Sequence, residues 1–494
     1  MRTVILGCCG LERRHLERFA DAAPTLTALG ARGVEATLET DGPSCPTSAW
    51  PTLYTGTDPS HHGIFGPNDL GAGYPDEPTP VSGVHVRRPA LWEYLSSEGA
   101  RSVVMNVPLT HPADPIDGVV VPGPPAPADE RGYPDGVREA VGFVSGDEYT
   151  IHPQGETLEA HRELLERRRR AFASALDVYE WELAVCHLSA LAPLLSTGDD
   201  EQVRAAVEAT DRTLESILET VDEETNVVCC STHGVERTTR EIGLNDLLAG
   251  ANYLETRGGS AHTPSTPLAD GLERLRTLGR RVLGRTEPSR ATRRIDWPNS
   301  LAYCPETDYE GIRVNLAGRD PNGQVPPSRY RAVCDDLVET LAALETPTGD
   351  PAFESVRLRE RRYGGPFLEN APDVFVRPTA GYRLSAALGT RPIRAAGGYR
   401  RTPRGLFLGS GPDFDTGSEG ERRLSLASVA PLTMGLLGRP VPSLMTGDPA
   451  AQVLERTPER AEYVGVAAGA ATVDPTFDDA DITAHRREVG SSEF

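Results

Sequence analysis

The sequence predicts an α/β protein built on a central, mostly parallel sheet with helices on both faces. Apolar runs of four to six residues alternate along the chain with longer amphipathic stretches of helical character. This alternation is typical of parallel strands joined by helical crossovers, and it differs from the continuous strand runs of all-β proteins. With 494 residues, the chain is long enough to bury a large core.

The first elements follow one another in this pattern. A strand is predicted over Val4–Cys8, followed by a helix to about Leu29 and a second strand over Val34–Thr40. A helix is then expected to start near Ala49, after the turn-rich stretch DGPSCPTS. The helix RRPALWEYLSSEG and the strand SVVMNVP complete this part of the chain.

The next two strands carry the pattern further. Residues 156–184 are largely helical in character and lead into the strand LAVCHLS, and a helix over 202–220 precedes a strand at 226–231. In parallel sheets, the loops at the carboxyl ends of the strands form the functional site. The loops of interest are therefore those that follow Cys9, Cys45, Ser189 and Ser231.

The domain organisation is predicted from composition. Residues 1–465 are expected to form one α/β domain, in which the Arg-, Gly- and Thr-rich stretch 251–294 is an insertion or small cap over the site. The segment 466–494 is rich in Ala, Asp and Thr and acidic, so we expect a mobile tail.

The charge pattern excludes some classes of partner. The formal net charge is −22, and every basic residue other than histidine is an arginine. This halophile-like composition favours a hydrated acidic surface and disfavours nucleic acid and anionic membranes as partners. The start of the chain does not resemble a signal peptide, and no stretch approaches the roughly 18 apolar residues of a membrane span. A cytoplasmic location is therefore expected.

Eight cysteines are present without a CxxC pair, which argues against a structural zinc knuckle. Several of them lie inside apolar, strand-like runs and are expected to be reduced and buried.

Eight segments are informative when they are taken together in chain order. They are VILGCCG, SAWPTLYTGTDPSHHGIFG, NVPLTHPADPIDGVVVPG, STHGVERTTREIGLNDLL, IRVNLAGRDPNGQV, RRYGGPFLENAPDVFV, RRTPRGLFLGSGPDF and LASVAPLTMGLLGRPVPSLMTG. In this order they resemble the type I phosphodiesterase/nucleotide pyrophosphatase branch of the alkaline phosphatase superfamily, and the resemblance covers most of residues 1–465. The resemblance implies an alkaline-phosphatase-like three-layer α/β/α sandwich with a small cap.

The resemblance also implies a chemistry. Members of this family usually hydrolyse phosphate esters with two metal ions, most often zinc, held by three Asp and three His side chains. Two close cations would neutralise the charge that develops on the attacking and leaving oxygens. A Thr or Ser hydroxyl bound to one metal would attack the phosphorus.

In this sequence most of these positions carry other residues. The first-strand Asp falls on Cys9, the nucleophile on Pro46 and the Asp of the Ser-Asp-His-Gly turn on Thr232, while its His survives as His233. The Asp-x-x-x-His motif falls near Ala192 and Ser196, and the last His falls on Arg401. Five of six ligand positions are therefore substituted, and a single imidazole does not hold a pair of metal ions.

The remaining polar residues admit more than one role. His233 is either a residual metal ligand or, as we favour, a residue that shapes its own turn. Cys9, Cys45 and Cys230 are either buried apolar side chains, which we favour, or ligands for one zinc ion together with His233. Arg401 either replaces the charge of a lost metal and holds an anion, or pairs with an acidic side chain.

Two hypotheses follow. The first is a catalytically degenerate family member, a pseudoenzyme without a cofactor, which binds a small anionic ligand or a protein partner. The second is an active hydrolase of phosphate or sulfate esters with a rebuilt site, in which Thr47, Cys9 or Cys45 carries the chemistry, with zinc as the alternative cofactor.

Overall fold

The computed structural model describes residues 1–71, 73–145, 157–188, 192–195, 199–257, 294–389, 391–417 and 422–466. The chain divides into two compact units. The first unit comprises Met1–Ile64, Pro80–Val235 and the chain from Arg401 onward, and the second comprises Phe65–Thr79 and Glu236–Arg400.

The first unit is organised around an eight-stranded sheet in the order β17-β2-β16-β6-β1-β5-β3-β4. Every neighbouring pair is parallel except the two that involve β16, which runs antiparallel to β2 and β6. The strands are β1 (Arg2–Gly7), β2 (Val34–Glu39), β3 (Ser102–Met105), β4 (Gly118–Val121), β5 (Leu183–His187), β6 (Thr225–Cys230), β16 (Arg404–Ser410) and β17 (Arg422–Ser425). The predicted α/β class and mostly parallel sheet are confirmed.

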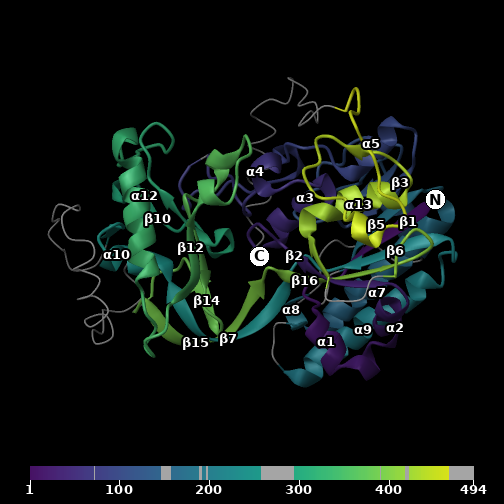
Figure 1. The fold of residues 1–494 in the computed structure, drawn as a ribbon, viewed down its shortest axis with the longest axis horizontal. Helices are drawn as coiled ribbons and strands as arrows, with labels where there is room; N and C mark the ends of the chain where they lie inside the picture. The colour runs from purple at the N-terminus through teal and green to yellow at the C-terminus, as the bar shows by residue number, and fades with distance from the viewer. Residues whose placement is uncertain are drawn as a thin grey trace. The chain divides into compact units, whose positions relative to one another are not determined.

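Helices cover both faces of this sheet, and each face has its own apolar core (Figure 1). One core is closed by α1 (Arg13–Arg18), α2 (Pro24–Arg32), α7 (Leu158–Val178) and α9 (Asp200–Leu218). The other is closed by α3 (Pro46–Thr55), α5 (Leu91–Ser97) and α13 (Val429–Leu436). The first unit also contains α4 (Pro59–His62), α6 (Val137–Ser145), α8 (Ala192–Leu195), β18 (Val441–Pro442) and β19 (Arg460–Ala461). Central strands buried on both faces explain the nearly continuous apolar runs in the sequence.

One predicted boundary was wrong in a way that matters for the site. The helix expected near Ala49 begins at Pro46, with Cys45 as its N-cap. Proline is favoured at the first helical position, because its missing N–H would have no partner there and its φ angle is already helical. Pro46 and Thr47 therefore lie in the first turn of α3 rather than in the preceding loop.

The second unit contains a four-stranded sheet in the order β10-β11-β13-β12 and a three-stranded sheet in the order β14-β7-β15. Helix α12 packs on the first of these sheets, against β12, β11 and β13 (Figure 1). The elements are β7 (Gly234–Gly243), α10 (Leu244–Gly250), β8 (Thr256–Arg257), β9 (Arg294–Ile295), β10 (Ala302–Tyr303), β11 (Gly311–Val314), α12 (Pro327–Ala342), β12 (Phe353–Leu358), β13 (Val374–Pro378), β14 (Tyr382–Ser385) and β15 (Ile393–Thr402).

The predicted cap and tail lie almost entirely outside the described residues. Of the stretch 251–294, residues 258–293 are not described, but its two ends pair as the antiparallel strands β8 and β9. Of the segment 466–494, only Val466 is described. Over the described part of the chain, every helix is too short or too polar to cross a lipid bilayer.

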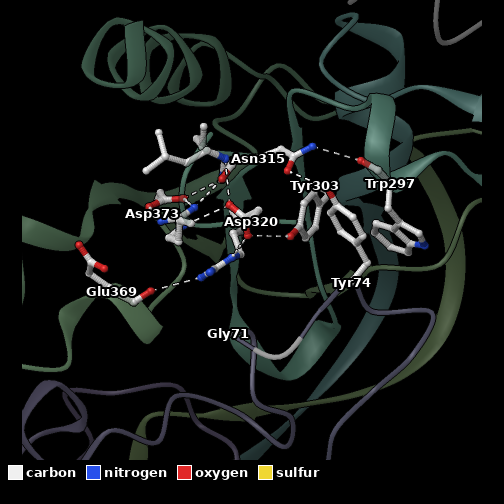
Figure 2. Close-up of polar contacts among 12 residues, drawn as sticks. Gly71, Tyr74, Trp297, Tyr303, Asn315, Asp320, Glu369 and Asp373 are labelled. Carbon is white, nitrogen blue, oxygen red and sulfur yellow. Dashed lines mark hydrogen bonds and ion pairs between the residues drawn. The ribbon is translucent and has the colours of Figure 1, made fainter. Parts of the chain in front are cut away.

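A buried ionic cluster holds the second unit together (Figure 2). Arg319 donates to both carboxylate oxygens of Asp373 at 2.8 Å, and Arg313 donates to Asp320 at 2.9 Å. The side chains of Arg313, Asp320 and Asp373 are at most 1% exposed. Burial alone raises the pKa of Asp373, but hydrogen bonds from Arg319 and the charges of neighbouring arginines outweigh it and hold the pKa below its usual value.

We expect Asp373→Ala to lower the free energy of unfolding of the second unit by about 3–5 kcal/mol, because it removes the buried carboxylate paired with Arg319 and leaves Arg313 and Arg319 to share Asp320. Asp335→Ala is the matched control, since Asp335 pairs with Arg331 at the surface and both side chains are more than half exposed. Its loss should cost about 0–1 kcal/mol. Urea unfolding measures both values, and equal losses would contradict the cluster's role.

Candidate functional site

Three neighbouring strands end at the same level of the main sheet. The parallel register pairs Gly7 of β1 with His187 of β5 on one side and with Cys230 of β6 on the other. Backbone hydrogen bonds continue beyond the strands: the Cys8 N–H donates to the Cys230 carbonyl at 2.8 Å, and the Gly10 N–H donates to the His233 carbonyl at 3.2 Å. The turns that follow β1 and β6 are therefore fixed against each other.

The side chains of these two turns form a chain of hydrogen bonds. Cys9 Sγ lies 3.2 Å from Thr232 Oγ1, which lies 3.0 Å from His233 Nδ1. All three residues are at most 3% exposed. The Thr40 hydroxyl donates to the Thr232 carbonyl at 2.8 Å, and the Ser231 hydroxyl donates to the His233 carbonyl at 2.6 Å. Three residues at predicted ligand positions are thus partners of one another.

His187 is a second buried imidazole in this region, and sequence reasoning missed it. Its Nδ1 lies 3.2 Å from the Asn106 carbonyl, and its ring meets Trp50 edge-on with 4.9 Å between the ring centroids. His187 is the last residue of β5, so it precedes the segment in which the Asp-x-x-x-His motif is expected. A polar residue at the carboxyl end of an apolar strand was the available signal.

Both imidazoles are neutral near pH 7. Burial lowers the pKa of His233 to about 3, and the positive charge of Arg401 lowers it further. Burial likewise lowers the pKa of His187 to about 3, aided by Arg168 and slightly by His233, while the hydrogen bond to the Asn106 carbonyl opposes the shift. The charge of His233 contributes to the lowered pKa of His187, so the two imidazoles lie close enough to interact. A neutral imidazole can accept a proton or ligate a metal.

Other predicted residues lie around this centre. A Cβ atom added at Gly10 would lie 3.6 Å from the Cα atom of Ala192, so Ala192 borders the Cys9–Gly10 turn. Arg401, at the end of β15, is exposed and acts on His233 through its charge. Ser196 lies outside the described residues.

Helix α3 is attached to the same strand end. A Cβ atom on Gly7 would lie 2.5 Å from the Trp50 ring, so this close approach of helix to strand requires glycine. Cys45 is buried, and its carbonyl accepts the N–H groups of Ser48 and Ala49 as the helix begins. Thr47 is half-buried in the first turn. That the side chains of Cys45 and Thr47 lie near His233 remains a prediction.

The donors at this site do not fit a pair of zinc ions. The centre offers imidazoles, a thiol and a hydroxyl, and His233 Nδ1 already bonds Thr232. No carboxylate occupies the Cys9, Thr232 or Ala192 position. Among the described residues, no group of three or more His, Cys, Asp or Glu side chains is arranged to hold a metal ion. A dimetal centre needs several hard carboxylates, which these positions lack.

The comparison with protein families decides the ancestry. The model of type I phosphodiesterases/nucleotide pyrophosphatases matches residues 3–400. The chain belongs to this family. No curated protein matches the sequence.

Solved structures of alkaline-phosphatase-like proteins share the family fold. Phosphonoacetate hydrolase from Sinorhizobium meliloti, in complex with phosphonoformate, is similar with a TM-score of 0.55 and 14% identity over 89% of this chain and 95% of that chain. Murine ectonucleotide pyrophosphatase/phosphodiesterase 5 is similar with a TM-score of 0.53 and 12% identity over 92% of this chain and 100% of that chain. At such identities the likeness concerns the fold alone.

The buried histidines predict a specific response to acid. His187 and His233 have folded-state pKa values of about 3, below the ordinary 6.5, so the folded state resists protonation that the unfolded chain accepts. Their contribution is present above pH 6.5 and is lost as the pH falls toward 3. For each histidine, the free energy of unfolding should therefore fall by about 2 kcal/mol between pH 7 and pH 5.

His187→Asn should therefore flatten the fall in unfolding free energy over this range, measured by urea unfolding at several pH values. Parallel curves for the variant and the parent chain would show that His187 is protonated equally in both states.

Proposed function

We propose that this chain is a catalytically degenerate member of the type I phosphodiesterase/nucleotide pyrophosphatase family. It acts in the cytoplasm by binding a small anionic ligand or a protein partner rather than by metal-dependent hydrolysis. One observation carries the proposal: the side chains at three ligand positions, Cys9, Thr232 and His233, are buried and hydrogen-bonded to one another. A site that satisfies its own polar groups has no need of a metal ion to do so.

The position and charge of Arg401 are the reason for proposing an anionic ligand. Arg401 occupies the position at which the family's last histidine is expected, and its positive charge helps to lower the pKa of His233. A guanidinium group binds phosphate, sulfate or carboxylate through paired N–H donors. It supplies part of the positive charge that metal ions would supply in an active relative, without any ability to activate a nucleophile by coordination.

A second candidate function is an active hydrolase of phosphate or sulfate esters with a rebuilt site. The observation that favours it is the contact between the Thr232 hydroxyl and the neutral imidazole of His233, because a hydroxyl beside a base is an arrangement for nucleophilic attack. Cys9 at the other end of the hydrogen-bond chain extends the same path for a proton. Cys45 and Thr47 remain further candidates for a nucleophile in this scheme.

We expect the chain purified without chelator to carry no stoichiometric zinc or manganese, measured by elemental mass spectrometry. We also expect it not to hydrolyse aryl phosphate mono- and diesters when either metal is added. Stoichiometric zinc that is lost in His233→Ala would overturn the proposal. Turnover that survives metal removal but is abolished by thiol alkylation would favour the rebuilt site.

Restoring carboxylates provides the complementary test. The double variant Cys9→Asp/Thr232→Asp should gain zinc affinity of at least about tenfold over the parent, since hard anionic ligands then flank His233. The matched control, Cys9→Ser/Thr232→Ser, alters the same hydrogen-bond chain without adding charge and should not gain affinity. Equal zinc binding by the two variants would show that these positions do not form the ancestral metal site.

A further inference from the structure

A second pocket lies in the first unit, beside the carboxyl-terminal half of α3. Residues of α3, of α5 and of the segments that precede and follow β3 line it. The empty space between them is about 510 Å³, part of it open to solvent, and the part that a group the size of a water molecule can reach is about 40 Å³. Since one water needs about 10–15 Å³ on that scale, the pocket holds a few heavy atoms.

The pocket brings together acidic groups that lack a cationic partner. Glu93 and Asp114 both line it, and neither forms an ion pair among the described residues. Glu93 accepts one hydrogen bond, from the Ala90 N–H at 2.5 Å. Burial raises the pKa of Glu93 to about 7, and the charge of Asp114 raises it further. Burial also raises the pKa of Asp114. Two desolvated carboxyl groups in one pocket favour the arrival of a cation.

The same lining contains an unsatisfied group of the opposite sign. The Nε atom of Arg88 is buried and has no hydrogen-bond partner among the described residues. A buried N–H group without an acceptor is destabilising, so an acceptor that reaches Arg88 Nε would be favoured. Arg88 forms no ion pair with Glu93 or Asp114, so the pocket presents a cationic donor and two acidic acceptors that do not satisfy one another.

Aromatic rings supply the wall of the pocket. Tyr54 and Trp92 both line it, with their ring centroids 5.0 Å apart and their planes tilted by 43°. Among the described residues, the Tyr54 hydroxyl donates a long hydrogen bond, 3.4 Å, to the Leu109 carbonyl. Aromatic faces attract organic cations. A divalent metal ion is less suited, because two carboxylates beside aromatic rings give it too few oxygen ligands.

We propose that this pocket binds a small zwitterion, an amino acid of about the size of glycine. Its carboxylate accepts the N–H of Arg88, and its ammonium group lies between Glu93 and Asp114 against the aromatic wall. A zwitterion satisfies both signs of charge at once, whereas a simple amine leaves Arg88 unsatisfied and a simple carboxylate faces two acidic groups. The proposal does not depend on the fate of the metal site.

Glycine, methylammonium and acetate are the probes, tested by isothermal titration calorimetry at pH 8 on the full chain. Glycine should bind saturably to one site per chain, and methylammonium and acetate should each bind at least about tenfold more weakly, since each lacks one charged contact. Methylammonium that binds as tightly as glycine, acetate that does so, or no saturable binding of glycine would each overturn the proposal.

Variants identify the site. Glu93→Gln/Asp114→Asn should weaken glycine binding at least about tenfold, and the Gln side chain can still accept the Ala90 N–H that helps to start α5. Asp117→Asn is the matched control, because Asp117 lies close by in sequence but is 44% exposed and outside the lining. Equal affinities for the two variants would place the binding elsewhere and overturn the assignment. Melting temperatures confirm that both variants fold.

Binding should also tighten from pH 6 to pH 8, because Glu93 loses its proton over this range and attracts the ammonium group more strongly. The other ionisable groups of the lining are Asp114, Arg88 and Tyr54. Burial holds the pKa of Tyr54 well above its usual value, so Tyr54 stays neutral throughout. The Glu93→Gln variant should lose the pH dependence, and a dependence that survives in it would contradict the role of Glu93.

Discussion

The parallel register of β5, β1 and β6 is the constraint on which the site depends. These strands are buried on both faces, so their alignment is fixed by packing as well as by the ladder of hydrogen bonds. Gly7 has a special place in this alignment, since a side chain there would collide with Trp50 and push α3 away from the strand end. The positions of Cys9, Thr232 and His233 follow from that register.

Burial then determines what chemistry these positions can support. A carboxylate in such a dry environment costs several kcal/mol unless a cation compensates it. In active relatives, metal ions would supply the compensation. Here the predicted carboxylate positions carry a thiol and a hydroxyl: Cys9 Sγ contacts Thr232 Oγ1, which in turn contacts His233 Nδ1. A carboxylate at either position would therefore need a bound cation beside it.

Buried acidic groups elsewhere in the chain differ in whether a cation compensates them. In the second unit, Asp320 and Asp373 are buried and paired with arginines, and the hydrogen bonds hold the pKa of Asp373 low. In the pocket beside α3, Glu93 is largely desolvated without such a partner, and its pKa is raised. Unlike the paired Asp373, Glu93 is a desolvated acid without an ion-pair partner among the described residues, a property that is common at functional sites.

The sequence by itself determined the fold class, the family and the order of the strands along the chain, because apolar periodicity and segment order are local properties of the sequence. It also predicted which ligand positions are substituted, with Cys9, Thr232 and Arg401 in place of Asp, Asp and His. Only the tertiary structure showed that Cys9 and Thr232 are bonded to each other, that His187 joins the same environment, and that Arg88, Glu93 and Asp114 share one pocket. Those relations join residues far apart in sequence or depend on burial, and neither the partner of a side chain nor its desolvation can be read from local sequence.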